Sequence, residues 1–230
     1  MTRQNEYGQP IGDPVPGPFP RPRPPRSEMS GRYGRLVPLD PSHAPALHAA
    51  YVSAPDGRGW TYLPNGPYEH ENDYAEWVEQ AARSDDPLHF IVLDRDDRPL
   101  GTASFLRIDP GAGVIEVGFI NFSHQMQRSR LSTEAMFLMM SRAFDDLGYR
   151  RYEWKCDALN APSITAAKRL GFTYEGTFRQ ATHYKGRNRD TAWFSIIDSE
   201  WPAIRAEFTR WLDPGNFDND GHQMIPLKTR

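Results

Sequence analysis

The stretch that decides the fold is DALNAPSITAAKRLGFTYEG, residues 157–176. It carries both a helix start signal and a helix stop signal. Asn160 can cap a first helical turn, and Pro162 is tolerated inside that turn. Gly171 can end the helix in a left-handed conformation, after which Phe172 packs back onto the core. The pattern therefore predicts a short helix with sharply defined ends that leads directly into a strand.

Outward from this helix, hydrophobic periodicity predicts alternating strands and helices on both sides. Three strands in succession before the helix indicate an antiparallel meander, and two after it indicate a closing hairpin. The predicted fold class is α/β, with a mixed, mostly antiparallel sheet flanked by helices. The expected strands are residues 35–39, 88–94, 100–109, 114–122, 149–158, 172–184 and 189–198, and the other helices are residues 41–54, 71–83, 131–148 and 198–212.

The composition is that of a water-soluble domain. Of 230 residues, 38% are hydrophobic and 25% are charged, with a formal net charge of -3. This balance gives no support to a nucleic-acid partner or to an anionic membrane surface. No apolar run approaches the roughly 18 residues of a membrane span, and no basic-then-apolar leader is seen. The lone cysteine, Cys156, excludes an internal disulfide and a cysteine-rich zinc site, so we expect a cytoplasmic protein without a metal.

The two ends of the chain differ in composition from its middle. Residues 10–25 read PIGDPVPGPFPRPRPP, in which eight of sixteen positions are proline. Such a segment favours extended polyproline conformations, either as a tail or as a ligand for a proline-recognition domain. The expected organisation is a tail over residues 1–31, one domain over residues 32–212 and a second tail over residues 213–230.

The junction VIEVGFINFSHQMQRSRLSTEAM, residues 114–136, is the first candidate binding site. A strand feeds a polar loop that becomes a helix start, where unpaired N–H groups can bind an anion. Arg128 and Arg130 would add charge-assisted contacts to phosphate oxygens. Taken alone, two arginines near a helix start are more often simply solvated.

Four segments taken in order resemble the GNAT superfamily of acyl-CoA-dependent N-acyltransferases. The resemblance covers about residues 36–212 and is strongest toward the branch of ribosomal-protein-alanine and small-molecule N-acetyltransferases. The segments are EVGFINF (116–122), QRSRLSTEA (127–135), NAPSITAAKRLGFTYEGTFR (160–179) and RDTAWFSIIDSEW (189–201).

The resemblance implies a cleft for acetyl-CoA, the cosubstrate, between two splayed strands. The strand backbone would pair with the pantetheine arm, and the loop before the next helix would cradle the pyrophosphate. Arg130 stands where the family has a glycine, and Ser132 stands where it has a glycine or alanine. Binding of the pyrophosphate needs backbone N–H groups and not glycine itself, so these two differences leave only the loop geometry open. The implied cofactor-binding residues are Phe119, Ile120, Asn121, Gln127, Arg128, Ser129, Arg130, Leu131, Ser132, Asn160 and Ser163.

Acyl transfer to an amine also needs a proton acceptor. Glu116, flanked by apolar residues in its strand, could be desolvated and act as this base, although a solvent-facing carboxylate is an equal alternative. Glu175 is a second candidate, for which a role in a turn or in an ion pair is the better explanation. For Glu134, inside a helix start, the helix dipole suffices as an explanation.

The leaving thiolate calls for a proton donor. Many GNAT enzymes use a tyrosine where this chain has Ala167, so Ser163 is the preferred substitute, Tyr184 is a more distant one, and solvent could also serve. Cys156 raises the alternative of an acyl-cysteine, against which a buried strand thiol is favoured. The histidines at 89, 124 and 183 lack metal-like spacing and are expected to be packing or surface residues.

The leading hypothesis is an acetyl-CoA-dependent N-acetyltransferase that acts by direct attack of a primary amine. The amine belongs to a small molecule or to a peptide or protein N-terminus. The resemblance implies an acceptor pocket lined by residues 55–71 and by the closing hairpin. In the 55–71 segment, Trp60, Tyr62 and Tyr68 belong either to a mobile lid or to ordinary packing. The alternatives are a non-catalytic acyl-CoA sensor and a scaffold that works through the proline-rich tail. The only argument for a homodimer is analogy with the family.

Overall fold

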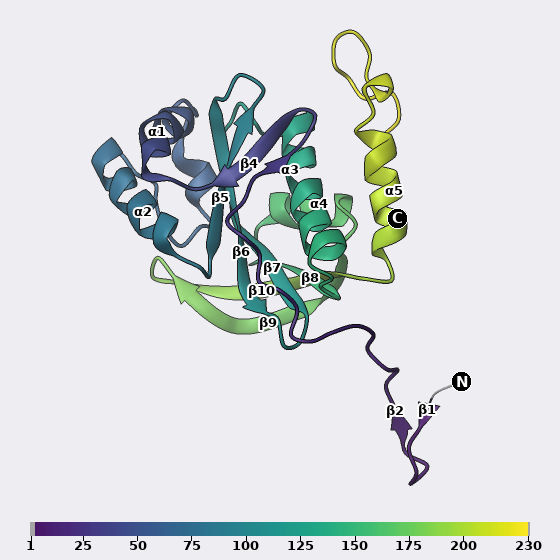
Figure 1. The fold of residues 1–230 in the computed structure, drawn as a ribbon. Coiled ribbons are helices and arrows are strands. Elements are labelled where there is room, and N and C mark those ends of the chain that lie inside the picture. Colours follow the sequence, from purple (N-terminus) through teal and green to yellow (C-terminus); the bar gives the residue numbers. More distant parts are fainter. Residues whose placement is uncertain (1–2, 230) are drawn as a thin grey trace.

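The centre of the molecule is an eight-stranded sheet with the strand order β3-β4-β5-β6-β7-β8-β10-β9 (Figure 1). The computed structural model describes residues 3–229. All neighbouring strands are antiparallel except β7 and β8, which are parallel. The predicted α/β class with a mixed, mostly antiparallel sheet is confirmed. The strands are β3 (Met29–Ser30), β4 (Gly34–Pro38), β5 (Leu88–Asp94), β6 (Pro99–Asp109), β7 (Val114–Phe122), β8 (Arg151–Asp157), β9 (Thr173–Tyr184) and β10 (Arg187–Ile197).

Helices cover both faces of this sheet and enclose two hydrophobic cores. Strand β5 shows the division, because Phe90 and Val92 belong to one core whereas Ile91 and Leu93 belong to the other. One face carries α1 (Ala44–Val52) and α2 (Glu71–Arg83), with the 3-10 turns η1 (Pro41–His43) and η2 (Gly57–Trp60) beside them. The other carries α3 (Arg130–Ser141), its π-helical continuation η3 (Arg142–Asp146), α4 (Ala161–Arg169) and α5 (Trp201–Trp211), which is followed by η4 (Pro214–Asn216).

The helix in the deciding stretch, α4, begins and ends as its sequence predicts. Asn160 caps it, with its Oδ1 accepting the N–H of Ser163 at 3.2 Å. Gly171 follows the helix with a φ of +98°, a conformation that favours glycine. Phe172 is 2% exposed and lies in the larger core. Local capping chemistry therefore fixes both ends of α4.

Strands β7 and β8 pair along only half of their length. The parallel pairing runs from Val114–Arg151 to Val117–Trp154 and then stops. At this point β7 bulges away: Phe119 has a φ of +47°, and two residues of β7, Phe119 and Ile120, oppose a single residue of β6. Bulges of this kind bend a strand and re-aim its side chains. The expected splayed strand pair is present.

Segments near both ends of the chain contact this body, and on the C-terminal side Thr229 donates to the carbonyl oxygen of Arg169 at 3.0 Å. The hairpin of β1 (Arg3–Gln4) and β2 (Pro10–Ile11) projects away from it (Figure 1), but further along Arg26 donates to the carbonyl oxygens of Ala82 and Ser84 at 2.9 and 2.6 Å. Strand β3, which lies within the predicted tail, pairs with β4. The division of the chain into residues 1–31, 32–212 and 213–230 stays a prediction.

The turn between β3 and β4 explains a buried carboxylate on α3. Glu134 is 4% exposed, and it accepts the N–H groups of Arg32 and Tyr33, each at 2.7 Å. A side chain at Gly31 would collide with this carboxylate. Burial raises the pKa of Glu134, and the backbone N–H groups oppose that rise. The helix dipole was thus an incomplete explanation, because Glu134 holds a turn distant in the sequence.

Candidate functional site

The gap between the splayed halves of β7 and β8 is where the predicted cofactor residues of β7 lie. Phe119, Ile120 and Asn121 all follow Val117, the last residue of β7 that pairs with β8. The carbonyl oxygen of Asn121 accepts the hydroxyl of Tyr51 on α1 at 2.8 Å, so this one backbone group is already engaged. Because the two strands are parallel, the loops that lead to α3 and α4 begin at the same edge of the sheet.

The loop into α3 folds without glycine. Ser129 caps the helix, and its Oγ accepts the N–H of Ser132 at 3.1 Å. Arg128 takes up the left-handed conformation, with a φ of +58°, whereas Arg130 and Ser132 keep negative φ angles. Gln127 donates from its side chain to the carbonyl oxygen of Phe122 at 2.9 Å. The loop geometry left open by the sequence is thus built with ordinary dihedrals at the two positions where the family has small residues.

The loop into α4 brings Asn160 and Ser163 to the other side of the gap. Ser163 Oγ accepts the indole N–H of Trp154 on β8 at 2.9 Å. The same hydroxyl lies beside Cys156, whose pKa is raised by burial and lowered to a lesser degree by the hydrogen bond from Ser163. Asn160 spends its Oδ1 on the helix cap. The polar side chains at this helix start are therefore largely occupied by structural contacts.

Glu116 lies at the closed end of the gap and is buried, with 2% of its surface exposed. Its Oε1 pairs with Arg107 on β6 at 2.7 Å, and its Oε2 pairs with Lys155 on β8 at 2.8 Å. Burial raises the pKa of Glu116, while Lys155 and then Arg107 oppose that rise. The solvent-facing alternative is thereby excluded. A proton taken up by the carboxylate would compete with these two ion pairs.

The pair of Glu116 and Lys155 continues into a longer ion network that runs along β8 and reaches β9. Lys155 also contacts Glu153 Oε2 at 2.7 Å, and Glu153 Oε1 accepts from Arg151 at 2.6 Å. Arg151 in turn pairs with Glu175 on β9, and this contact is the main cause of a pKa near 2 for that carboxyl group. The ion-pair explanation of Glu175 is confirmed. Sequence reasoning missed Lys155 and Arg107, although a lysine in the middle of the buried strand RYEWKCD was a usable signal.

The remaining titratable candidates are held by packing or by partners. Tyr184 donates to Asp157 Oδ2 at 2.7 Å, and burial raises its pKa to about 12. His89 is 4% exposed between the rings of Trp77 and Phe119, and burial lowers its pKa to about 4, so it is neutral near pH 7. His124 and His183 are exposed, and Ala167 is buried in the larger core.

A small cavity lies between the 55–71 loop and the bulged part of β7. Trp60 and Tyr68 from this loop pack edge to face on each other and on Tyr74 of α2, so the packing interpretation of these two rings is favoured. Tyr62 instead donates to the carbonyl oxygen of Leu159, beside the start of α4, at 3.0 Å. The cavity carries no formal charge; its lining is Trp60, Leu63, Asn65, Tyr74, Trp77, Thr102, Phe119 and Asn121.

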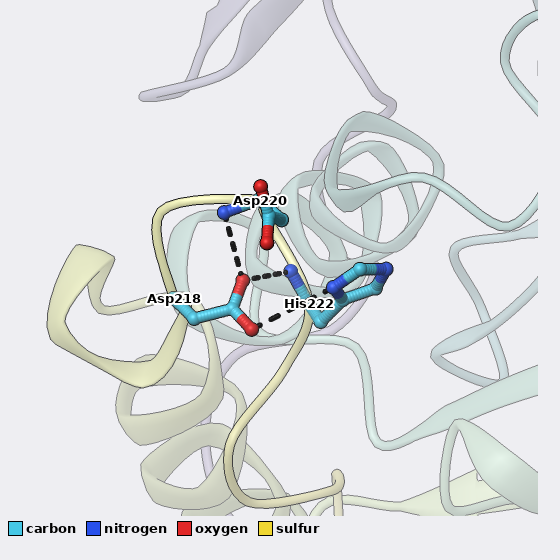
Figure 2. Close-up of side chains that lie close together, drawn as sticks. All are labelled: Asp218, Asp220 and His222. Atoms are coloured by element: carbon cyan, nitrogen blue, oxygen red, sulfur yellow. Dashed lines mark hydrogen bonds and ion pairs between the residues drawn. The ribbon is translucent and has the colours of Figure 1, made fainter.

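One exposed cluster near the C-terminus has a spacing suited to a metal ion. Figure 2 shows Asp218, Asp220 and His222, whose ligand atoms lie within 4.8 Å of one another. Asp218 Oδ1 accepts the N–H groups of Asp220 and His222 at 3.0 and 2.8 Å, so the turn's own hydrogen bonds account for the arrangement. We assign no ligand to it, and the absence of a metal from the reaction stays a prediction.

Comparison with known proteins defines the class to which this fold and site belong. The sequence model of the Acetyltransferase (GNAT) domain matches residues 35–173. The chain therefore belongs to the GNAT acetyltransferase family, a class of acyltransferase enzymes.

Particular relatives agree with this assignment. The crystal structure of a GCN5-related N-acetyltransferase from Brucella melitensis is 47% identical, with a TM-score of 0.88, over 91% of this chain and 96% of that one. Two curated relatives are each 30% identical over 48% of this chain: the uncharacterized N-acetyltransferase p20 of Bacillus licheniformis and the ribosomal-protein-serine acetyltransferase of Escherichia coli strain K12. The chain spans only 62% of the length of each of these two proteins.

No helix within residues 3–229 combines the length and the apolar character that a bilayer crossing requires.

Proposed function

We propose that the protein is an acetyl-CoA-dependent N-acetyltransferase whose acceptor is the primary amine of a small molecule or of a peptide or protein N-terminus. The single observation that carries the proposal is the end of β7–β8 pairing at Val117 and Trp154. It leaves a gap between two strands whose loops both lead to capped helix starts. Strand backbone without a strand partner suits an amide-containing arm, and helix starts suit phosphate oxygens.

The residues around the gap fit the cosubstrate part by part. The backbone of Phe119, Ile120 and Asn121 would lie along the pantetheine arm. The loop over residues 127–132 would hold the pyrophosphate, and Asn160 would lie beside the arm on the α4 side. When bound, acetyl-CoA supplies an acetyl thioester, and strand N–H groups aimed at its carbonyl oxygen favour the charge that develops there.

Two side chains are proposed to move protons. The amine nitrogen forms a bond to the acetyl carbon while the carbon–sulfur bond breaks, so the nitrogen must lose a proton and the sulfur must gain one. We assign the nitrogen's proton to Glu116 Oε1, reached directly or through water once Arg107 moves aside. Arg107 is the partner that can move away from Glu116, because its side chain is 62% exposed whereas that of Lys155 is 7% exposed. Ser163 accepts from Trp154, and its own hydrogen, which is directed at Cys156 in the structure, would turn to the sulfur of CoA.

The acceptor is proposed to approach from the side of the 55–71 loop and the β9–β10 hairpin. Lys185 and Arg187 at the tip of the hairpin donate to the carbonyl oxygens of Trp60 and Thr61, each at 2.8 Å, so the two segments close one wall together. The uncharged cavity beside Phe119 suits an acceptor whose group next to the amine is neutral. The relative from Escherichia coli, by its name, modifies a ribosomal protein at serine, which supports keeping proteins in the acceptor class.

The test is release of free thiol from acetyl-CoA with a panel of amines and short peptides, together with calorimetric binding of CoA. We expect turnover with at least one acceptor and a loss of about 10²- to 10⁴-fold in kcat for Glu116→Gln. The variant Glu76→Gln, at an exposed position on α2, is the matched control. Turnover that is indifferent to Glu116→Gln would remove that residue from proton transfer. Tight CoA binding without turnover on any acceptor would favour the sensor instead, and absence of CoA binding would refute the proposal.

A further inference from the structure

Arg130, the first residue of α3, is held between two aromatic rings from distant parts of the chain. Its guanidinium carbon lies 5.0 Å from the ring centroid of Tyr33 and 4.7 Å from that of Phe217. Both distances are within the range of a cation–π contact. Tyr33 precedes β4, and Phe217 follows η4 near the C-terminus. Both rings lie outside residues 35–173, the part of the chain that matches the family.

The two rings are themselves fixed. The hydroxyl of Tyr33 donates to the carbonyl oxygen of Leu212 at 3.0 Å. Phe217 packs edge to face on Trp211 of α5, with a centroid distance of 5.1 Å, and on Tyr33 at 6.4 Å. The turn that carries Phe217 is braced by Asn216, which is 7% exposed. Asn216 Nδ2 donates to the carbonyl oxygens of Trp211 and Ile225 at 3.1 and 3.0 Å.

This packing restrains Arg130 without using up its hydrogen-bonding capacity. A cation–π contact engages the face of the guanidinium, whereas its N–H donors point outward in the plane. Within residues 3–229, no carboxylate forms an ion pair with Arg130, and its side chain donates no hydrogen bond. By contrast, Arg107, Arg142 and Arg151 all hold acidic partners. Arg130 also borders a hollow beside the start of α3, together with Tyr33 and Ser129. It is a restrained cation with free donors next to open space.

We propose that Tyr33 and Phe217 position Arg130 as a side-chain ligand of the CoA pyrophosphate, so that the C-terminal turn over residues 213–222 belongs to the cosubstrate site. This inference rests on the proposed dependence on acetyl-CoA. A planar guanidinium can donate two parallel N–H groups to phosphate oxygens, and fixing it beforehand lowers the entropy lost on binding. The side chain at position 130 thereby supplies contacts that a glycine at this position could not.

The experiment is calorimetric binding of two ligands, CoA and pantetheine, to the full chain. Pantetheine has the arm but lacks the pyrophosphate. We expect Arg130→Gln to weaken CoA binding roughly 10- to 100-fold and Phe217→Leu, which keeps apolar volume but removes the ring, about 3- to 10-fold. Pantetheine binding should not change in either variant. Met224→Ala, which removes an exposed apolar side chain from the same C-terminal segment, is the matched control and should bind both ligands as the wild type does.

The double variant decides whether Phe217 acts through Arg130. If it does, Phe217→Leu has no further effect on CoA affinity in the Arg130→Gln background. Three results would each overturn the inference. CoA affinity could be unchanged in Phe217→Leu, Phe217→Leu could weaken CoA binding just as much in the Arg130→Gln background, or pantetheine could lose as much affinity as CoA. If Phe217→Leu does not fold, Arg130→Gln and Arg130→Lys keep the ring packing, and wild-type affinity in both would overturn it. Failure of the wild type to bind CoA would instead count against the proposed function.

Discussion

The paired and the open halves of β7 and β8 use polar groups in opposite ways. In the paired half, Glu116 and Glu153 are directly opposite each other, and both are buried. Like charges in such a pair repel, and burial makes the repulsion worse. Lys155 offsets this by contacting both carboxylates, and its ammonium lies 3.8 Å above the ring of Trp193. In the open half, the backbone of Phe119 and Ile120 has no partner on β8.

The difference separates what stabilises this fold from what is left for a ligand. The paired half places charges in a dry environment where each depends on its neighbours, so removing one leaves an uncompensated charge. The open half leaves backbone groups and the helix start at Arg130 with unused hydrogen-bonding capacity. Removing the shared cation of the first region should therefore lower stability most, whereas substitutions in the second region should change binding or turnover at a smaller cost in stability.

The largest effect is expected for Lys155→Met, which leaves Glu116 and Glu153 buried together without their shared cation. We expect the free energy of unfolding to fall by about 3–5 kcal/mol. Urea unfolding followed by circular dichroism measures it. The control is Lys168→Met, at an exposed position on α4, which should stay within about 0.5 kcal/mol of the wild type. A loss below about 1 kcal/mol for Lys155→Met would mean that water reaches the two carboxylates, and the contrast between the halves would fail.

A smaller effect on stability but a clear one on turnover is expected for Ser163→Ala in the open half. Removing the hydroxyl leaves the indole N–H of Trp154 unpaired, which should lower the free energy of unfolding by about 1 kcal/mol. It also removes the proposed proton donor, and this loss should lower kcat about 10²-fold. Steady-state kinetics over a pH series is the measurement.

The pH dependence of that variant separates a chemical role from a structural one. A leaving thiolate needs less help as the pH rises toward the thiol pKa of about 8.5, so the gap between Ser163→Ala and the wild type should narrow with increasing pH. Thr165→Ala, an exposed change on the same helix, should leave kcat unaltered. A constant ratio across the pH range would assign Ser163 to helix packing alone.

The elements that the sequence predicts best are those whose signals are local. The start of α4 depends on Asn160 and Ser163, three residues apart, and its stop depends on Gly171. Strands β5 and β7 likewise match the expected residues 88–94 and 114–122, because a run of apolar residues between turn signals is enough to define them. The helix expected over residues 131–148 ends instead in a π-helical turn, η3, since nothing in the local pattern marks that change.

The site itself depends on contacts that local patterns do not encode. The sequence makes Glu116 a candidate, but its partners Arg107 and Lys155 come from two other strands, and only the registers of β6 and β8 bring them together. The rings around Arg130 come from opposite ends of the chain. A sequence in isolation shows which side chains have useful chemistry, whereas the sheet register decides whether that chemistry is already engaged.

The smallest effect is expected at the exposed end of the ion network, where Glu175 meets Arg151. This contact lowers the pKa of Glu175 from 4.5 to about 2 in the folded protein. A lowered pKa means that the carboxylate stabilises the fold above its ordinary pKa, and that this contribution is lost as the pH falls from about 4.5 toward 2. Because the Glu175 side chain is 38% exposed, solvent screening limits the contribution to about 1 kcal/mol.

Urea unfolding between pH 6 and pH 2 should therefore show a shallower acid loss in Glu175→Gln than in the wild type, with the two curves converging at the acid end. Glu76→Gln again serves as the control, since Glu76 forms no ion pair within residues 3–229, and its curve should parallel that of the wild type. Convergence at the acid end is the discriminating feature: a variant that is uniformly less stable at every pH has lost packing, not an ion pair. In that case the network would end at Arg151, and Glu175 would have no part in holding the paired half together.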